Sequence, residues 1–169
     1  MKHLKKIAVA LVLFVATTAF VNAQAKVAHI NVQQLLQEMP AMKQADAELK
    51  KLNETLGADI QASMTEARNK ATQYQNEAPS KTAEENAKRE QEIMTYRETI
   101  QTAQQAAQQE LQKKQQELLA PIQESAMKAI EKVAAAQGYD YVMDASPGAG
   151  VLVAKGKDLL ADVKKELKF

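Results

Sequence analysis

Apolar residues recur at helical spacing along two long stretches of the chain. In residues 41–76 they step by three or four positions: Ala45, Leu49, Leu52, Leu56, Ile60, Met64, Ala67, Ala71 and Tyr74. In residues 83–137 similar steps connect Ala83, Ala87, Ile93, Tyr96, Ile100, Ala103, Ala107, Leu111, Leu118, Ile122, Ala126, Ile130 and Val133. Such a narrow stripe predicts that each helix packs along one line against a partner helix, as in a coiled coil.

The break between the two stretches predicts a tight helical turn. Thr82 and Glu85 have the spacing of a capping box, which starts a helix at residue 83. Gly138 is suited to end that helix, because glycine readily adopts the left-handed conformation. Since the connection is short, the two helices are predicted to fold back on each other as an antiparallel hairpin.

The outer half of this hairpin is predicted to be weakly held. Many of its stripe positions are alanine, which buries little area at ~25 cal/mol per Å². Gly57 adds a softer place, because glycine costs about 1 kcal/mol relative to alanine inside a helix. Pro121 predicts a bend or an interruption in the second helix. We therefore expect the outer half to open more readily than the base.

The two ends of the chain have shorter patterns. Residues 26–32 predict a strand and residues 33–38 a short helix that stops before Pro40. After Gly138, two strands at 139–145 and 151–155 around a turn at 146–150 predict a β-hairpin, and Asp158 precedes a last helix at 159–167. The predicted fold class is therefore α+β and predominantly α, with a long antiparallel helical hairpin projecting from a small β-sheet and helix body.

This pattern divides the chain into a body and an arm. Residues 24–40 and 138–169 form the predicted association body, and residues 41–137 form the arm, with its tip near 77–82. Residues 1–23 carry three lysines, an apolar run at 7–21 and the small-residue site Val21-Asn22-Ala23, which together predict a cleaved signal peptide. The apolar run is shorter than the ~20 residues of a membrane span, so export is favoured over a membrane anchor.

Composition narrows the function. Loss of Lys2, Lys5 and Lys6 lowers the basic count from 22 to 19 against 21 acidic residues, which leaves a near-neutral chain and no basic face for nucleic acid. There is no cysteine, and His29 is the single histidine after residue 23. The usual zinc-ligand sets are therefore excluded, and we expect no metal, no cofactor and no enzymatic activity.

The predicted body is too small to be comfortably stable alone, and its strands have open edges. We therefore expect a homo-oligomer. The residues predicted to form its interface are Val27, Ile30, Val32, Tyr139, Tyr141, Val142, Val151, Leu152, Val153, Leu159 and Val163.

The arm offers a second candidate surface. Methionine gives an adaptable apolar surface, and the thin alanine-rich stripe leaves room for such a role. The residues predicted to contact a bound client are Met64, Tyr74, Met94 and Tyr96.

The order of these segments resembles the Skp, or OmpH-like, family of periplasmic chaperones. The resemblance spans the chain after the export signal and rests on Ile30-Asn31-Val32, Gln33-Gln34-Leu35-Leu36 before Pro40, Pro121-Ile122, Gly138-Tyr139, Tyr141-Val142-Met143-Asp144, the run from Gly150 to Lys155, and the run from Asp158 to Val163. It implies a periplasmic homotrimer shaped like a jellyfish, whose three arms enclose unfolded outer-membrane proteins without ATP.

One feature departs from that family. Well-studied members are strongly basic, whereas this chain is near neutral, so its charge does not support contact with lipopolysaccharide or a membrane. The alternative is a structural coiled-coil spacer or an adaptor of an envelope complex, which would need a continuous regular seam. A lipid-binding amphipathic helix would need a broad apolar face with a basic border, and the stripe is narrow.

Overall fold

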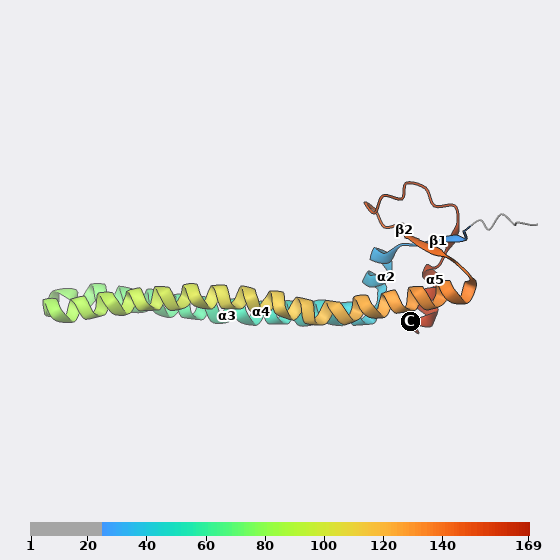
Figure 1. The fold of residues 1–169 in the computed structure, drawn as a ribbon. Coiled ribbons are helices and arrows are strands. Elements are labelled where there is room, and N and C mark those ends of the chain that lie inside the picture. Colours follow the sequence, from blue (N-terminus) through green and yellow to red (C-terminus); the bar gives the residue numbers. More distant parts are fainter. Residues whose placement is uncertain (1–24) are drawn as a thin grey trace, which may run out of the picture.

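A long helical hairpin dominates the computed structural model, which describes residues 25–169. Helix α3 (Pro40–Glu77) and helix α4 (Ala83–Gln137) run side by side and are joined by the short 3-10 helix η1 (Ala78–Ser80). At 1.5 Å per residue, α3 is about 57 Å long. The remaining elements gather where α3 begins and α4 ends (Figure 1). The predicted fold class is confirmed, whereas the predicted signal peptide lies outside the described residues.

Local signals in the sequence define both ends of α4. The Glu85 N–H donates to the Thr82 hydroxyl at 3.2 Å, and the Thr82 N–H donates to the Glu85 carboxylate at 2.9 Å, which completes the predicted capping box. Gly138 ends the helix with φ of 70°. Of the two outcomes predicted at Pro121, a bend or an interruption, the interruption is wrong, because α4 continues through it. Pro121 lies on an exposed face, where the carbonyl that it frees can bond to water.

The seam between α3 and α4 is thin. In the arm beyond the body, only the small side chains Ala67 and Ala107 are buried, whereas Leu52, Leu56 and Ile60 remain half-buried. Two helices cannot surround a leucine, so each large apolar residue keeps one side open.

Part of the predicted stripe on α4 is wrong. Ala83, Ala87 and Ala103 are exposed. Near the tip, Asn86 and Arg89 are more buried than these alanines, and the Asn86 side chain donates to the Ala78 carbonyl at 3.1 Å. Longer polar side chains reach across the turn where alanine is too short.

The body combines a three-stranded sheet with two short helices. Strand β1 (Val27–Ile30) lies between β2 (Tyr141–Asp144) and β3 (Lys157–Asp158), and both neighbours run parallel to it. Helix α2 (Val32–Glu38) follows β1, and α5 (Leu160–Glu166) follows β3. The register pairs Val27 with Tyr141 and Ile30 with Asp144.

The predicted β-hairpin at 139–155 is therefore wrong. Residues 151–155 form no strand, and β2 pairs with β1 rather than with a neighbour across a tight turn. Since β2 and β3 are both parallel to β1, a tight turn cannot connect them, and residues 145–156 form a crossover loop instead. The apolar run at 151–153 resembles a strand in sequence. It packs against little else in this chain, as the 97% exposure of Leu152 shows.

One apolar core joins the two chain ends to the base of the arm. Ile30, Leu35, Leu159 and Val163 are almost completely buried. Ala126, Ile130 and Val133 from the last turns of α4 complete the same cluster. The base of α4 therefore packs against several elements of the body, whereas the outer part of α4 packs mainly against α3.

Hydrogen bonds reinforce this junction between the ends. The buried Ser146 hydroxyl donates to the Asp144 carboxylate at 2.6 Å and accepts the Gln33 N–H at 3.0 Å. The Val32 N–H also donates to Asp144. Although burial acts to raise the pKa of the Asp144 carboxyl, the bonds from Ser146 and Val32 hold it below its usual value. The start of α2 is thus tied to the end of β2.

The two helix-associated glycines give opposite predictions. Replacement of Gly57 by alanine should raise the free energy of unfolding by about 0.5–1 kcal/mol, because it lies inside α3 and a new Cβ would meet no atom within 4 Å. Replacement of Gly138 by alanine should lower it by about 1 kcal/mol or more, because φ is positive there. Urea denaturation followed by circular dichroism measures both, and equal signs for the two variants would contradict this account.

Candidate functional site

An apolar groove runs between the helices in the outer half of the arm. It has a volume of about 400 Å³, and its apolar lining comes from Met64, Ala67, Ala71, Ile93 and Ile100. Met64 is 45% exposed at this groove. A larger hollow of about 730 Å³ adjoins it toward the tip and shares some of these residues. The thin seam therefore leaves an apolar strip open along the outer arm, and polar side chains such as Asn86 and Glu90 join its lining toward the tip.

Two arginines also line this groove. Arg68 from α3 and Arg97 from α4 contribute its charged side chains, together with the amides of Gln101 and Gln104. Among the described residues, neither guanidinium has a carboxylate within 4 Å. The groove is thus both apolar and positively charged.

An ion-pair cluster closes the hairpin around Glu92 of α4. Lys70 donates to Glu92 Oε1 at 2.7 Å, and the Tyr74 hydroxyl donates to Glu92 Oε2 at 2.7 Å. The Lys70 ammonium also lies 5.0 Å from the centre of the Tyr96 ring. We call these four residues, together with the pair Glu77 and Arg89, the arm clamp.

The pair Glu77 and Arg89 completes the arm clamp nearer the tip. Arg89 donates to Glu77 at 2.6 Å, and its guanidinium lies 4.6 Å from the centre of the Tyr74 ring. Closer to the body, Lys114 and Glu48 lie 2.7 Å apart. These contacts fix the antiparallel register of α3 and α4.

Hydrogen bonding shifts the protonation of the arm clamp. The bond from Lys70, and then that from Tyr74, holds the pKa of the Glu92 carboxyl below its ordinary 4.5. The bond to Glu92 in turn raises the pKa of Lys70 and that of the Tyr74 hydroxyl. Bonds from Gln73 and Arg89 lower the pKa of Glu77. The shifts of Lys70, Glu77 and Glu92 keep these groups charged near neutral pH, and the shift of Tyr74 keeps its hydroxyl protonated, so that it can donate to Glu92.

The four predicted client-contact residues divide into two kinds. Met64 and Met94 are exposed, at 45% and 50%, and are available to a partner. Tyr74 and Tyr96 are half-buried in the arm clamp, where their rings hold the hairpin together. Sequence reasoning missed Arg68 and Arg97, although all three arginines of the chain fall between residues 68 and 97. The client role of all four predicted residues stays a prediction.

The predicted interface residues also divide by exposure. Tyr141 is 61% exposed and Leu152 is 97% exposed, and Val27 and Val153 are exposed as well. Val32, Tyr139, Val142 and Val151 are half-buried. Ile30, Leu159 and Val163 fill the core of the protomer itself. Their assignment to an interface stays a prediction. The four exposed residues are the ones whose apolar surface a second copy could cover without rearrangement of the protomer.

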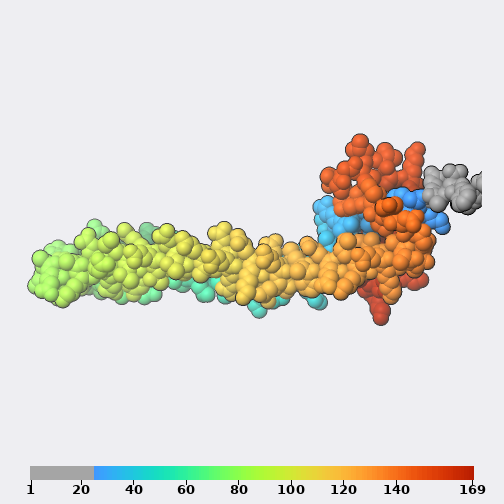
Figure 2. All heavy atoms as spheres, viewed as in Figure 1, coloured from blue at the N-terminus to red at the C-terminus, as the bar shows by residue number. Residues whose placement is uncertain are grey.

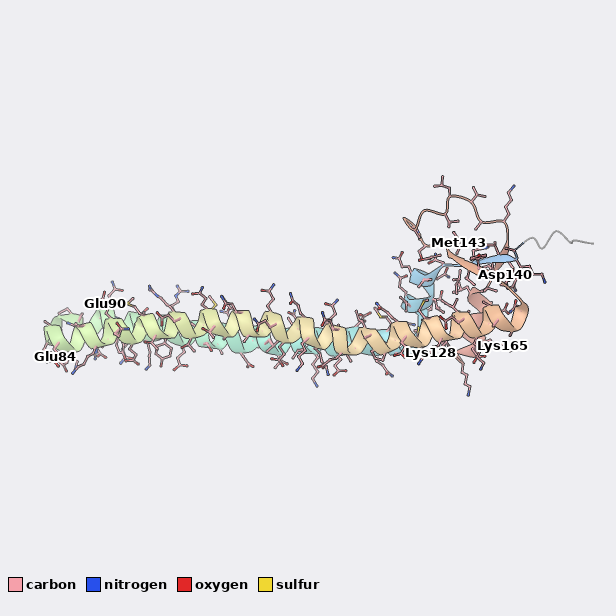
Figure 3. All side chains as sticks on the ribbon, in the orientation of Figure 1. Glu84, Glu90, Lys128, Asp140, Met143 and Lys165 are labelled. Carbon is pink, nitrogen blue, oxygen red and sulfur yellow. The ribbon has the colours of Figure 1, made fainter. Side chains whose placement is uncertain are left out.

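Several exposed apolar residues belong to the strands and to one loop of the body. The loop at 145–156 rises from the body away from the arm (Figure 2). Met143 of β2 was not among the predicted interface residues, but it is 48% exposed and lies at the sheet beside this loop (Figure 3). Strand register also places Val27 next to Tyr141. The exposed apolar residues of the body therefore come from β1, β2 and the loop.

Little in the described part of the chain suggests catalysis. Residues 25–169 contain no group of three or more His, Asp or Glu side chains placed to hold a metal ion. His29 lies half-buried in β1. Within the same residues, no helix has the length and apolarity required to cross a membrane. The absence of enzymatic activity stays a prediction.

A helical-hairpin arm carried on a small α/β body defines the class of this protein, and comparison with known proteins identifies its family. Residues 26–167 match the family model described as outer membrane protein (OmpH-like). The chain belongs to this family, as the resemblance predicted. No curated protein sequence matches the chain significantly.

A solved structure has the same fold. It is described as an OmpH-like outer membrane chaperone from Caulobacter crescentus CB15. The two structures superpose with a TM-score of 0.76 over 87% of this chain and 86% of the other, at 18% sequence identity. At this identity the similarity establishes the fold alone.

The arm clamp predicts acid-sensitive closure of the outer arm. Because the pKa of Glu92 is lowered in the folded arm, the stabilisation is complete above the ordinary carboxyl value of 4.5 and is lost as the pH falls through the folded pKa. Glu92→Gln should remove the stabilisation already at pH 7. Native-state hydrogen exchange, normalised for intrinsic rates, should then show faster exchange in residues 68–96.

The matched control is Glu48→Gln, which removes one ion pair near the body. It should accelerate exchange less than Glu92→Gln, because Glu92 accepts two bonds across the hairpin and Glu48 pairs only with Lys114. Equal effects from the two variants would show that the arm clamp has no special role.

Proposed function

We propose that this protein is an ATP-independent holdase chaperone of the periplasm, which binds unfolded outer-membrane proteins in a cavity between the arms of a homotrimer. Membership of the OmpH-like family supports this proposal. The description of the Caulobacter crescentus structure as an outer membrane chaperone agrees with it.

The observation that carries the proposal is the open apolar strip along the arm. Met64, Ile93 and Ile100 line a groove that no third helix of residues 25–169 covers. An unfolded chain offers apolar side chains at many points along its length, so several weak contacts along several arms can hold it. A binding surface of this kind needs no energy source to release its guest to a folding site.

Assembly follows from the small body and its open surfaces. Both β2 and β3 are edge strands with one unpaired side, since only β1 lies between them. The adjacent loop exposes Leu152 and Val153. Pairing with other copies would provide hydrogen-bond partners for the open strand edges. Burial of a side chain such as Leu152 in the interface would stabilise the oligomer by about 1.5–3 kcal/mol.

The holdase proposal predicts suppression of aggregation. An unfolded outer-membrane β-barrel protein is diluted from urea with and without an excess of the mature protein, and light scattering is recorded. Scattering should fall strongly with the full chain. It should remain high with a variant in which a short glycine-serine turn replaces residues 57–105, because this deletion removes the groove and the arm clamp, while the Glu48–Lys114 pair keeps the register of the remaining hairpin.

The same deletion provides its own control. Since the core residues of the body lie outside 57–105, sedimentation should give the same oligomer as the full chain. Unchanged scattering with the full chain would refute the holdase proposal and favour a spacer or an adaptor. Loss of assembly on deletion would mean that the association surface includes the arm.

The association surface predicts that single charges separate the protomers. Leu152→Asp and Tyr141→Lys should each weaken assembly about tenfold to a hundredfold, because each places a charge where apolar area would be buried. The fold of the protomer should survive, since both side chains are exposed. Analytical ultracentrifugation measures the assembly, with Met94→Asp on the arm as the matched control.

Two results would contradict this assignment. One is a wild-type chain that stays monomeric at micromolar concentration. The other is a variant carrying both body substitutions that assembles as the wild type does.

A further inference from the structure

We propose that the outer-arm groove selects polypeptide segments in which an apolar side chain lies next to a carboxylate, with Arg68 and Arg97 as the carboxylate receptors. The inference rests on the proposed holdase function and names the chemistry that the arm prefers in its guest. Its basis is the combination of an apolar lining with two arginines, one from each helix, in a single groove.

The arginines of the groove differ from the other cations of the outer arm. Lys70 pairs with Glu92, Arg89 with Glu77 and Lys88 with Glu84. Lys81 lies 4.0 Å from Glu85. Arg68 and Arg97 alone among the cations between residues 68 and 97 have no carboxylate within 4 Å in the described structure. Their charge is therefore available to an external anion.

The geometry favours an anionic guest. Arg68 and Arg97 line one groove, and an anion bound there would be attracted to both positive charges. The same groove contains no acidic side chain. Arginine also presents a planar fork that binds a carboxylate through two hydrogen bonds, which lysine cannot reproduce. The apolar lining beside it accepts the neighbouring side chain of the guest.

The surroundings favour an unfolded polypeptide over an anionic lipid surface. A membrane-binding helix needs a broad apolar face with a basic border. Here the exposed Glu66, Glu90 and Glu98 lie on the same helices close in sequence to the groove arginines. Glu84 and Glu90 project from the outer arm (Figure 3). These acids would repel an anionic bilayer laid across the arm, whereas an extended peptide can enter the groove, whose own lining contains no acidic side chain.

The test uses the assembled mature protein and labelled, unstructured twelve-residue peptides. The three peptides repeat Leu-Asp-Ser, Leu-Asn-Ser or Leu-Lys-Ser, and fluorescence anisotropy gives their affinities. The Asp peptide should bind more tightly than the Asn peptide, and the Lys peptide should bind least. The double variant Arg68→Gln/Arg97→Gln should weaken binding of the Asp peptide at least about tenfold, as expected for loss of charge-assisted hydrogen bonds.

A charge-matched control separates the groove from the net charge of the arm. Lys51→Gln/Lys113→Gln also removes two positive charges, but from exposed positions elsewhere on the hairpin. It should leave the preference for the Asp peptide unchanged. Arg68→Lys/Arg97→Lys keeps the charge and the helix propensity and should give an intermediate loss, and it decides the question if the glutamine variant fails to assemble.

Three results would overturn the inference. The first is a wild type that binds the Asp and Asn peptides equally, and the second is an equal loss in the lysine control. The third is a glutamine variant that loses binding to phosphatidylglycerol vesicles while binding the Asp peptide as the wild type does, because the groove would then serve a lipid surface.

The aggregation assay separates this inference from the function on which it rests. A wild type that prevents aggregation without preferring the Asp peptide would refute the groove chemistry alone. A wild type that prefers the Asp peptide but does not prevent aggregation would refute the holdase function and leave the groove as a peptide-binding site.

Discussion

Two helices packed along one line cannot enclose a large side chain, and this constraint governs the arm. Alanine fills the closest contacts at Ala67 and Ala107, whereas Leu52, Leu56 and Ile60 keep part of their surface in water. The seam therefore contributes little apolar stabilisation per turn. It also leaves the apolar strip that a partner could cover. The incomplete burial of large apolar side chains thus weakens the hairpin and also creates its candidate binding surface.

Polar contacts between α3 and α4 compensate for the thin apolar seam in the outer arm. In the outer arm, Glu92 joins Lys70 and Tyr74 across the helices, and Arg89 joins Glu77. Such partly exposed pairs are individually weak, so they hold the register without making the arm rigid. Between Glu48 and Lys70 on α3, no ion pair to α4 appears in the described structure. That interval contains Gly57, and an arm able to flex there could adapt to guests of different size.

The body shows the opposite balance. Core residues from β1, α2, α5 and the end of α4 bury one another. The Val32 N–H donates to Asp144 and the Gln33 N–H to Ser146, which joins residues more than a hundred positions apart. The arm is thus anchored firmly at one end and loosely closed beyond it. The open β2 edge and the exposed Leu152 lie on the body. Under the proposed function, copies would join at the firm end and leave the compliant ends to hold the guest.

The sequence determined what depends on local interactions. The capping box at Thr82 and Glu85, the left-handed Gly138 and the helical spacing of apolar residues set the hairpin, because each involves neighbours within a turn or two. Tertiary structure alone decided which strands pair, since parallel pairing with β1 depends on residues at the far end of the chain and leaves no local signal in 151–155. It also decided that Tyr74 and Tyr96 close the hairpin while Arg68 and Arg97 stay unpaired. Which charges meet across two helices depends on their register, and that register is fixed only when the helices pack.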